Sequence, residues 1–91
     1  MRYVKVKVQG HVQGVGFRYF TRKIAIKYDI AGWVKNKNDG SVVMEARGDE
    51  ADIAHFLAEI RKGPSRFAEV QEMNVIDLEG DPRFTEFRIK H

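Results

Sequence analysis

The first part of the chain shows two successive hydrophobic patterns. Between residues 2 and 9 apolar residues alternate with polar ones, so that Val4, Val6 and Val8 share one face. This period of two predicts a strand that is packed on one side. From Phe17 onward the apolar spacing becomes helical. The apolar stripe of that segment consists of Phe17, Phe20, Ile24, Ala25 and Tyr28. We expect a helix that starts at Phe17 and ends before Gly32.

The middle of the chain contains two short strand patterns, at residues 30–36 and 41–48. They are separated by Lys37–Gly40, whose Asp-Gly step is a typical hairpin signal. Alternate residues of the second strand are expected to face inward, namely Val42, Met44 and Ala46. The residues between and after them are expected to face outward, namely Val43, Glu45 and Arg47. The two segments therefore predict a β-hairpin.

A second helical pattern follows this hairpin. Asp49 suits the N-cap position, and Glu50 and Asp52 place negative charge in the first helical turn. The expected buried stripe consists of Ile53, Phe56, Leu57 and Ile60. Because glycine and proline both stop a helix, we expect this one to end at Gly63-Pro64.

The last part of the chain has strand patterns of unequal quality. Residues 67–77 are strand-like, but their alternation fails around Glu72 and Met73, which predicts a β-bulge there. After a turn at residues 80–82, Thr85, Phe87 and Ile89 alternate with charged residues. This pattern predicts a short terminal strand.

The order strand, helix, strand, strand, helix, strand, with a short terminal strand added, is typical of the split βαβ or ferredoxin-like fold. We therefore predict a single α+β domain over residues 1–91, in which an antiparallel sheet carries both helices on one face. Right-handed crossovers would make the first two strands parallel, with the third strand between them. Residues 10–18 should then lie beside residues 35–37 at one edge of the sheet.

Composition and charge exclude several kinds of site. The chain has 91 residues and no cysteine, which excludes disulfides, zinc–thiolate sites, thiol nucleophiles and iron–sulfur clusters. Its net charge of +3 favours an anionic partner only mildly. The N-terminal residues lack the apolar core of a signal peptide, and no apolar run reaches the length of a membrane span. We expect a complete, unprocessed, monomeric protein of the cytoplasm.

The glycine-rich loop of residues 10–16 is the most informative candidate for chemistry. It leads into a helix without Ser, Thr, Asp or Asn at its start, so the first backbone N–H groups lack a side-chain cap. Such a helix start attracts anions, and Arg18 in the first turn could add a bidentate contact to a phosphate or carboxylate. The loop matches neither the P-loop nor the dinucleotide-binding pattern. The residues alone favour an oxyanion site and a simple connecting loop equally.

Asn36, at the end of the second strand, is the other candidate. An asparagine beside a hairpin commonly shapes the turn, but its amide could also orient a water molecule. His11, His55 and His91 have no metal-ligand spacing, so we expect no metal site. We expect His11 to be a loop side chain rather than a base.

Two segments resemble the signatures of the acylphosphatase family, both in residue type and in spacing. The first segment reads Gly10-His11-Val12-Gln13-Gly14-Val15-Gly16-Phe17-Arg18. The second reads Gly32-Trp33-Val34-Lys35-Asn36, followed by Gly40-Ser41-Val42 and Gly48. The resemblance covers the whole chain. It implies a small stand-alone enzyme that hydrolyses acyl phosphates to a carboxylate and inorganic phosphate, with neither metal nor cofactor.

The resemblance also implies roles for individual residues. The phosphate would be cradled by the Arg18 side chain and by the backbone of Gln13, Gly14, Val15, Gly16, Phe17 and Arg18. Asn36 would position the attacking water. Because a carboxylate leaving group has a pKa of roughly 4, it departs as an anion and needs no general acid. The proton of the water could pass to the phosphate of the substrate itself.

Other functions remain as alternatives to this one. A phosphohistidine intermediate on His11 would give a different mechanism. Domains of this fold also bind RNA through aromatic residues on the sheet, but residues 41–47 contain none and carry Glu45 outward. An acylphosphatase-like domain can also be one module of a larger maturation enzyme. We expect a free enzyme that acts on a small acyl phosphate and has neither nucleic acid nor membrane as a partner.

Overall fold

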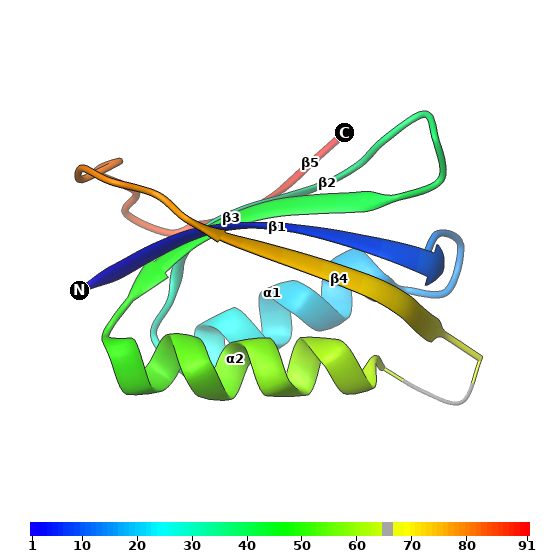
Figure 1. Ribbon diagram of the computed structural model, residues 1–91, viewed down its shortest axis with the longest axis horizontal. Helices are drawn as coiled ribbons and strands as arrows, with labels where there is room; N and C mark the ends of the chain where they lie inside the picture. The colour runs from blue at the N-terminus through cyan, green and yellow to red at the C-terminus, as the bar shows by residue number, and fades with distance from the viewer. Residues whose placement is uncertain (65–66) are drawn as a thin grey trace.

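The strands and helices expected from the sequence are present in the computed structural model, which describes residues 1–64 and 67–91 (Figure 1). In chain order the elements are β1 (Arg2–His11), α1 (Phe17–Lys27), β2 (Ala31–Asn36), β3 (Val42–Gly48), α2 (Glu50–Lys62), β4 (Glu69–Asp77) and β5 (Phe87–Lys90). The predicted order of elements is therefore confirmed. Of the segment expected at residues 67–77, the strand occupies Glu69–Asp77.

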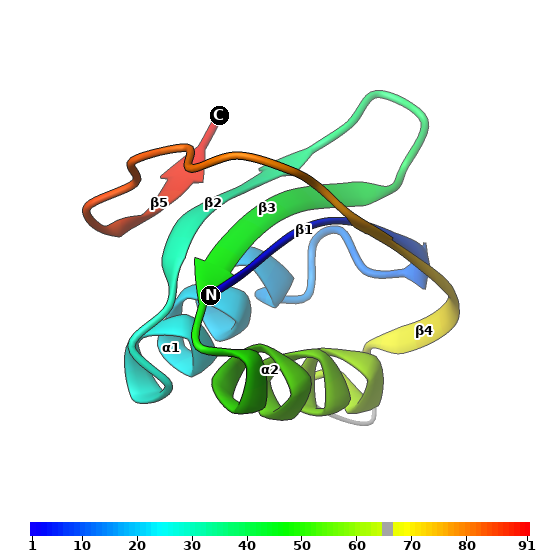
Figure 2. The ribbon, with the colours of Figure 1, turned by 60° about the vertical axis from the view of Figure 1, so that its left-hand side comes forward.

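The sheet has the strand order β4-β1-β3-β2-β5. β3 lies between β1 and β2 and is antiparallel to both, as the crossover rule requires, and β4 is antiparallel to β1. β5 pairs in parallel with β2, so the sheet, which we expected to be antiparallel, is mixed at this edge. The reason lies in the connection of residues 78–86, which leads from one edge of the sheet to the other (Figure 2). β4 ends where β2 begins, so β5 starts at that same end.

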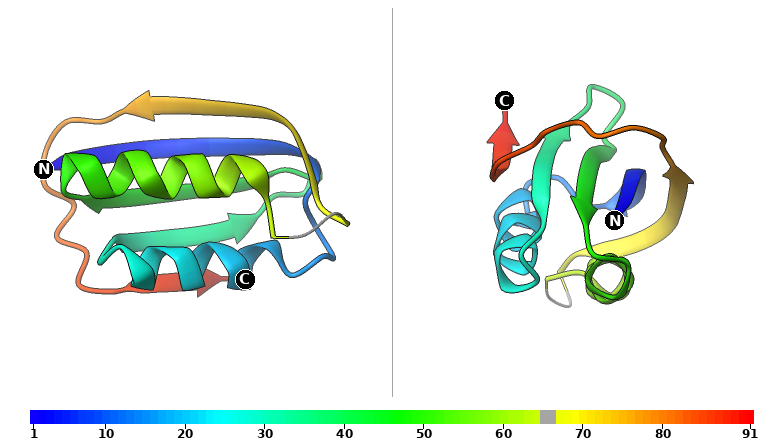
Figure 3. Two further views of the ribbon diagram at one scale, coloured as in Figure 1. Left: turned by 90° about the horizontal axis from the view of Figure 1, so that it is seen from below. Right: turned by 90° about the vertical axis from the view of Figure 1, so that its left-hand side faces the viewer.

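Both helices cover one face of the sheet (Figure 3). The strands contribute to the core Val4, Val6, Val8, Val34, Val42, Met44, Ala46 and Phe87. The helices contribute Phe17, Thr21, Ile24, Ala25, Ile53, Phe56 and Ile60. Each fully buried large apolar side chain stabilises the fold by about 1.5–3 kcal/mol. Neither helix of residues 1–64 and 67–91 has the length and hydropathy needed to span a membrane.

The predicted helical stripes are confirmed, with their edges only partly buried. Phe20, Tyr28 and Leu57 are half-buried and pack against the core. Asp49 is the N-cap of α2 but makes no side-chain hydrogen bond there. Its negative charge and those of the acidic first turn still interact favourably with the positive end of the helix dipole. α2 ends before Gly63, as predicted.

Val43 on β3 departs from the predicted alternation, because it is buried although it faces away from the helices. Its cross-strand partners are Lys7 on β1 and Lys35 on β2. Long lysine side chains cover neighbouring apolar surface with their methylene groups while their ammonium groups stay in water. The outer face of the sheet is therefore shielded locally by charged residues.

The predicted bulge in β4 is present, one position before the expected one. Gln9 pairs with Glu72 but Gly10 pairs with Val70, so Gln71 is the extra residue. Gly10 has a φ of +133°, and a Cβ atom there would lie 2.1 Å from the carbonyl oxygen of Glu69. Only glycine permits this close approach of the two backbones.

The terminal strand is shorter than predicted. Pairing with β2 begins at Gly32 and Phe87, and the backbone N–H of Gly32 donates to the carbonyl of Glu86 at 2.9 Å. Thr85 therefore lies outside β5 and is exposed, contrary to its expected place in the alternating pattern. Phe87 is buried and Ile89 half-buried, as predicted.

Candidate active site

The segment between β1 and α1 ends in an uncapped helix start. Gly14 and Gly16 both have a φ of +77°, in the left-handed region that glycine adopts without steric cost. Gly16 is the N-cap of α1, where no side chain bonds to the first turn, and that turn holds no acidic residue. Its first backbone N–H groups are thus left for a ligand. Successive amides in such loop conformations form concavities that bind anions.

One small hollow brings the two predicted catalytic residues together. Its volume is about 110 Å³, and its walls are formed by Val12, Gly14, Gly16, Phe17, Arg18, Tyr19 and Asn36. Asn36 ends β2 and Arg18 lies in the first turn of α1. The start of α1 and the β2–β3 hairpin lie at one end of the sheet (Figure 1). The predicted proximity of residues 10–18 to residues 35–37 is therefore confirmed.

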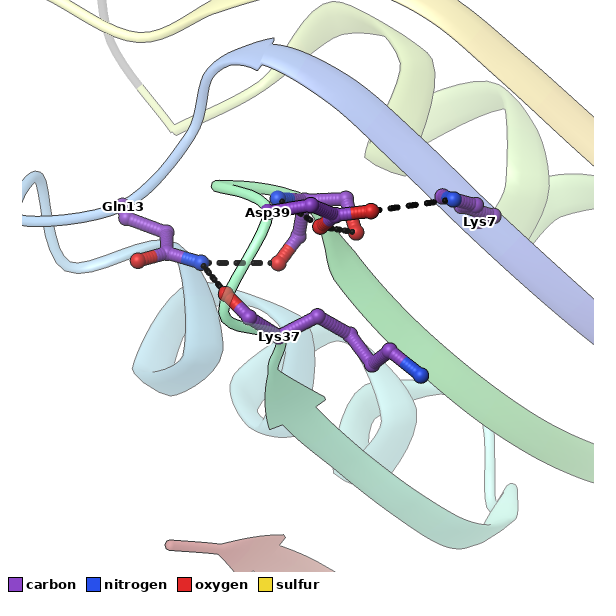
Figure 4. Close-up of polar contacts among 5 residues, drawn as sticks. Lys7, Gln13, Lys37 and Asp39 are labelled. Atoms are coloured by element: carbon purple, nitrogen blue, oxygen red, sulfur yellow. Dashed lines mark hydrogen bonds and ion pairs between the residues drawn. The ribbon is translucent and has the colours of Figure 1, made fainter.

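Gln13 connects the glycine-rich loop to the hairpin between β2 and β3. Its side-chain Nε2 donates to the carbonyl of Lys37 at 2.7 Å and to that of Ser41 at 2.8 Å (Figure 4). Neither Gln13 nor Val15 lines the hollow, although both were predicted to belong to the phosphate-binding loop. The Gln13 side chain thus holds the loop against the hairpin that carries Asn36.

Asp39 organises the same hairpin from inside. Its carboxylate accepts a hydrogen bond from the backbone N–H of Ser41 at 2.9 Å and another from the Ser41 hydroxyl at 2.5 Å. Lys7 on β1 forms an ion pair with it at 3.2 Å. The bonds from Ser41 and the ammonium group of Lys7 together hold the pKa of Asp39 well below its ordinary value.

The side chain of Arg18 contacts the last two residues of the chain. Its Nη1 donates to the carbonyl of Lys90 at 3.1 Å and lies 3.2 Å from Nδ1 of His91. No carboxylate pairs with Arg18 within the part of the chain that the structure describes. Its remaining N–H groups and its full charge are left for a ligand. Lys90 and His91 were not predicted to contact Arg18, because the parallel pairing of β5 with β2 brings them to this place.

His11 and His55 do not line the hollow. His11 is exposed at the end of β1, and His55 packs edge-on against Tyr28. Among residues 1–64 and 67–91, no three His, Asp or Glu side chains are grouped as metal ligands would be.

A larger hollow of about 480 Å³ lies at the far end of α1. Arg22 and Arg47 line it, but both guanidinium groups donate to backbone carbonyls, those of Phe87 and Phe84. Asp29 and Glu86 add negative charge to its walls. Its walls therefore carry charges of both signs, whereas none of the described residues that line the hollow beside Arg18 is acidic.

Comparisons of sequence and structure agree on one family. The family profile for acylphosphatase matches residues 4–89. An acylphosphatase of Oceanobacillus iheyensis is 50% identical over 91 residues, covering 100% of both chains. The crystal structure of acylphosphatase from Bacillus subtilis matches with a TM-score of 0.96 and 37% identity over 100% of both chains. Full-length HypF in its phosphate- and nucleotide-bound form matches at a TM-score of 0.87 and 32% identity, covering 99% of this chain and 12% of HypF. The chain therefore belongs to the acylphosphatase family, the hydrolases of the carboxyl–phosphate bond.

Proposed function

We propose that this acylphosphatase holds the phosphoryl group of its substrate with residues 13–18 and orients the attacking water with Asn36. One observation carries the proposal: an uncapped helix start, the Arg18 guanidinium and the Asn36 amide surround a single hollow of about 110 Å³. The positive helix start and Arg18 belong to α1 and the loop before it, and the uncharged Asn36 amide belongs to β2. The arrangement suits one anion and one water molecule.

The phosphoryl oxygens are held by charge and by oriented donors. Backbone N–H groups at the start of α1 point to a site where the helix dipole favours negative charge. Arg18 supplies a planar fork of donors that matches two phosphoryl oxygens. Phosphoryl transfer depends mainly on positioning and on stabilising the charge of these oxygens, so the site needs no covalent intermediate.

Asn36 supplies the orientation of the nucleophile. Its amide oxygen accepts a hydrogen bond from the water, which aligns a lone pair of the water oxygen with phosphorus. The new P–O bond forms as the bond to the acyl oxygen breaks, and the acyl group leaves as a carboxylate. Since that carboxylate has a pKa of roughly 4, no general acid is required. The water proton passes to a phosphoryl oxygen, which leaves inorganic phosphate as the second product.

Hydrolysis of benzoyl phosphate tests this mechanism. We expect turnover that is unchanged by EDTA, and a loss of about 100-fold or more in Arg18→Gln. Arg22→Gln is the matched control, because Arg22 lies one helical turn further and donates to the carbonyl of Phe87. Circular dichroism verifies that each variant is folded. Loss of turnover in EDTA, or equal loss in both variants, would contradict the mechanism.

The rival mechanism through His11 is tested in the same assay. His11 is exposed and does not line the hollow, so we expect His11→Ala to keep the wild-type rate. A folded but inactive His11→Ala would instead support a phosphohistidine intermediate.

We also propose that residues 1–91 act as one free, monomeric domain in the cytoplasm, on a small acyl phosphate and without nucleic acid. The match to the Oceanobacillus relative over its full length supports a free domain rather than a module. On the outer face of β3, Glu45 accepts a hydrogen bond from Tyr3 and Arg47 donates to the carbonyl of Phe84. β3 itself contains no aromatic residue on which a base could stack.

A further inference from the structure

The hollow between Arg18 and Asn36 has room for the phosphoryl group but not for the whole substrate. Its volume is about 110 Å³. A water molecule occupies roughly 30 Å³ in the liquid, so the hollow has the capacity of only three or four waters. A phosphoryl group and the attacking water fill that space. The acyl group must therefore lie outside it, against a neighbouring surface.

The mechanism decides on which side the acyl group leaves. The attacking oxygen and the leaving oxygen lie roughly in line through phosphorus. If the water sits at Asn36, on the side of the sheet, the leaving oxygen points to the opposite wall. Apart from Asn36, the residues that line the hollow all belong to the loop and the start of α1, and we take them as that wall: Val12, Gly14, Gly16, Phe17, Arg18 and Tyr19. A second hollow that includes Asn36, formed by Lys35–Asp39, lies on the side of the attacking water and is disfavoured for the acyl group.

Only one side chain of this wall is free to contact an acyl group. The two glycines have none, and Val12 and Phe17 are buried in the core with 1% and 2% of their surfaces exposed. Arg18 is engaged with the phosphoryl group and with Lys90. Tyr19 remains, and 68% of its surface is exposed. Among residues 1–64 and 67–91 its ring has no aromatic neighbour and its hydroxyl no hydrogen-bond partner.

We propose that the ring of Tyr19 is the surface on which the acyl group rests, and that this side chain determines how tightly a flat, apolar acyl group is bound. The inference depends on the proposed function, since it uses the in-line geometry set by Asn36. Burial of apolar area between the two groups stabilises the complex, and an aromatic acyl group gains further from ring-to-ring contact. An acetyl group is too small to gain much from either effect.

Two substrates and three variants test the role of Tyr19. The values of kcat and KM are measured with benzoyl phosphate and acetyl phosphate for the wild type, Tyr19→Ala and Tyr19→Phe. Ile26→Ala is the matched control, because Ile26 is an apolar residue of the same helix with 60% exposure. We expect Tyr19→Ala to lower kcat/KM for benzoyl phosphate by roughly five-fold, mainly through KM. Acetyl phosphate should be little affected, and Tyr19→Phe and Ile26→Ala should behave as the wild type with both substrates.

An equal effect of Tyr19→Ala on both substrates would overturn the inference, because the ring would then act on the phosphate site or on the fold. No effect on benzoyl phosphate would overturn it as well. In both cases the wild type still hydrolyses the substrates, so the proposed function stands. A folded wild type that hydrolyses neither substrate would instead refute the proposed function, and the role of Tyr19 with it.

Discussion

At the scale of single residues, Asp39 shows how a carboxylate outside the hollow prepares the site. Two hydrogen bonds from Ser41 and the ion pair with Lys7 favour its charged form. Its pKa in the folded protein is therefore lowered from the ordinary value of 3.8. Because folding lowers this pKa, the charged Asp39 carboxylate stabilises the fold at pH values above its pKa in the unfolded chain. This stabilisation is lost as the pH falls toward the pKa of Asp39 in the folded protein.

Replacement of Asp39 by asparagine tests this linkage. We expect Asp39→Asn to lower Tm at pH 7, and the difference from wild type to shrink as the pH falls below 3.8, the ordinary value that applies to the unfolded chain. Thermal unfolding followed by circular dichroism between pH 2 and 7 (about the range in which carboxylates titrate) measures it. Glu79→Gln, at an exposed carboxylate of the loop after β4, is the control. A Tm difference that does not change with pH would contradict the role of the charge.

At the scale of elements, Gln13 determines how the loop before α1 sits against the hairpin that carries Asn36. Without its two hydrogen bonds, the carbonyls of Lys37 and Ser41 lose their side-chain donor. We expect Gln13→Ala to lose about 1–2 kcal/mol of stability and roughly ten-fold in kcat, because the phosphate and the water are no longer held in line. Urea unfolding and benzoyl phosphate assays check both values. Gln71→Ala, at the exposed bulge of β4, should leave kcat unchanged, and equal losses in the two variants would argue against this role.

The elements also show what the sequence could and could not predict. The helices and the hairpin follow from local apolar spacing and from Asp39-Gly40, so they were correctly predicted. The uncapped helix start and the position of Arg18 in its first turn were also predicted, because both depend only on residues that are neighbours in the sequence. The parallel edge strand was not, because its direction depends on where residues 78–86 cross the sheet. The contacts of Arg18 with Lys90 and His91 depend on that crossing, so no local pattern contained them.

At the scale of the whole molecule, the fold separates the two tasks of the site. The cationic groups lie on α1 and its loop, which are fixed by Gln13 on one side and by Lys90 on the other. The Asn36 amide, which we propose orients the water, lies at the end of β2, an inner strand of the sheet. This division predicts that phosphate affinity and turnover can be lost separately.

The most direct test of the account compares kcat for benzoyl phosphate with the inhibition constant of inorganic phosphate, in folded wild type, Arg18→Gln and Asn36→Ala. We expect Arg18→Gln to lose both turnover and phosphate affinity. Asn36→Ala should lose about 100-fold in kcat while it binds phosphate as tightly as the wild type. If Asn36→Ala retained its turnover, or lost phosphate affinity as far as Arg18→Gln does, the assignment of the water to Asn36 would be contradicted.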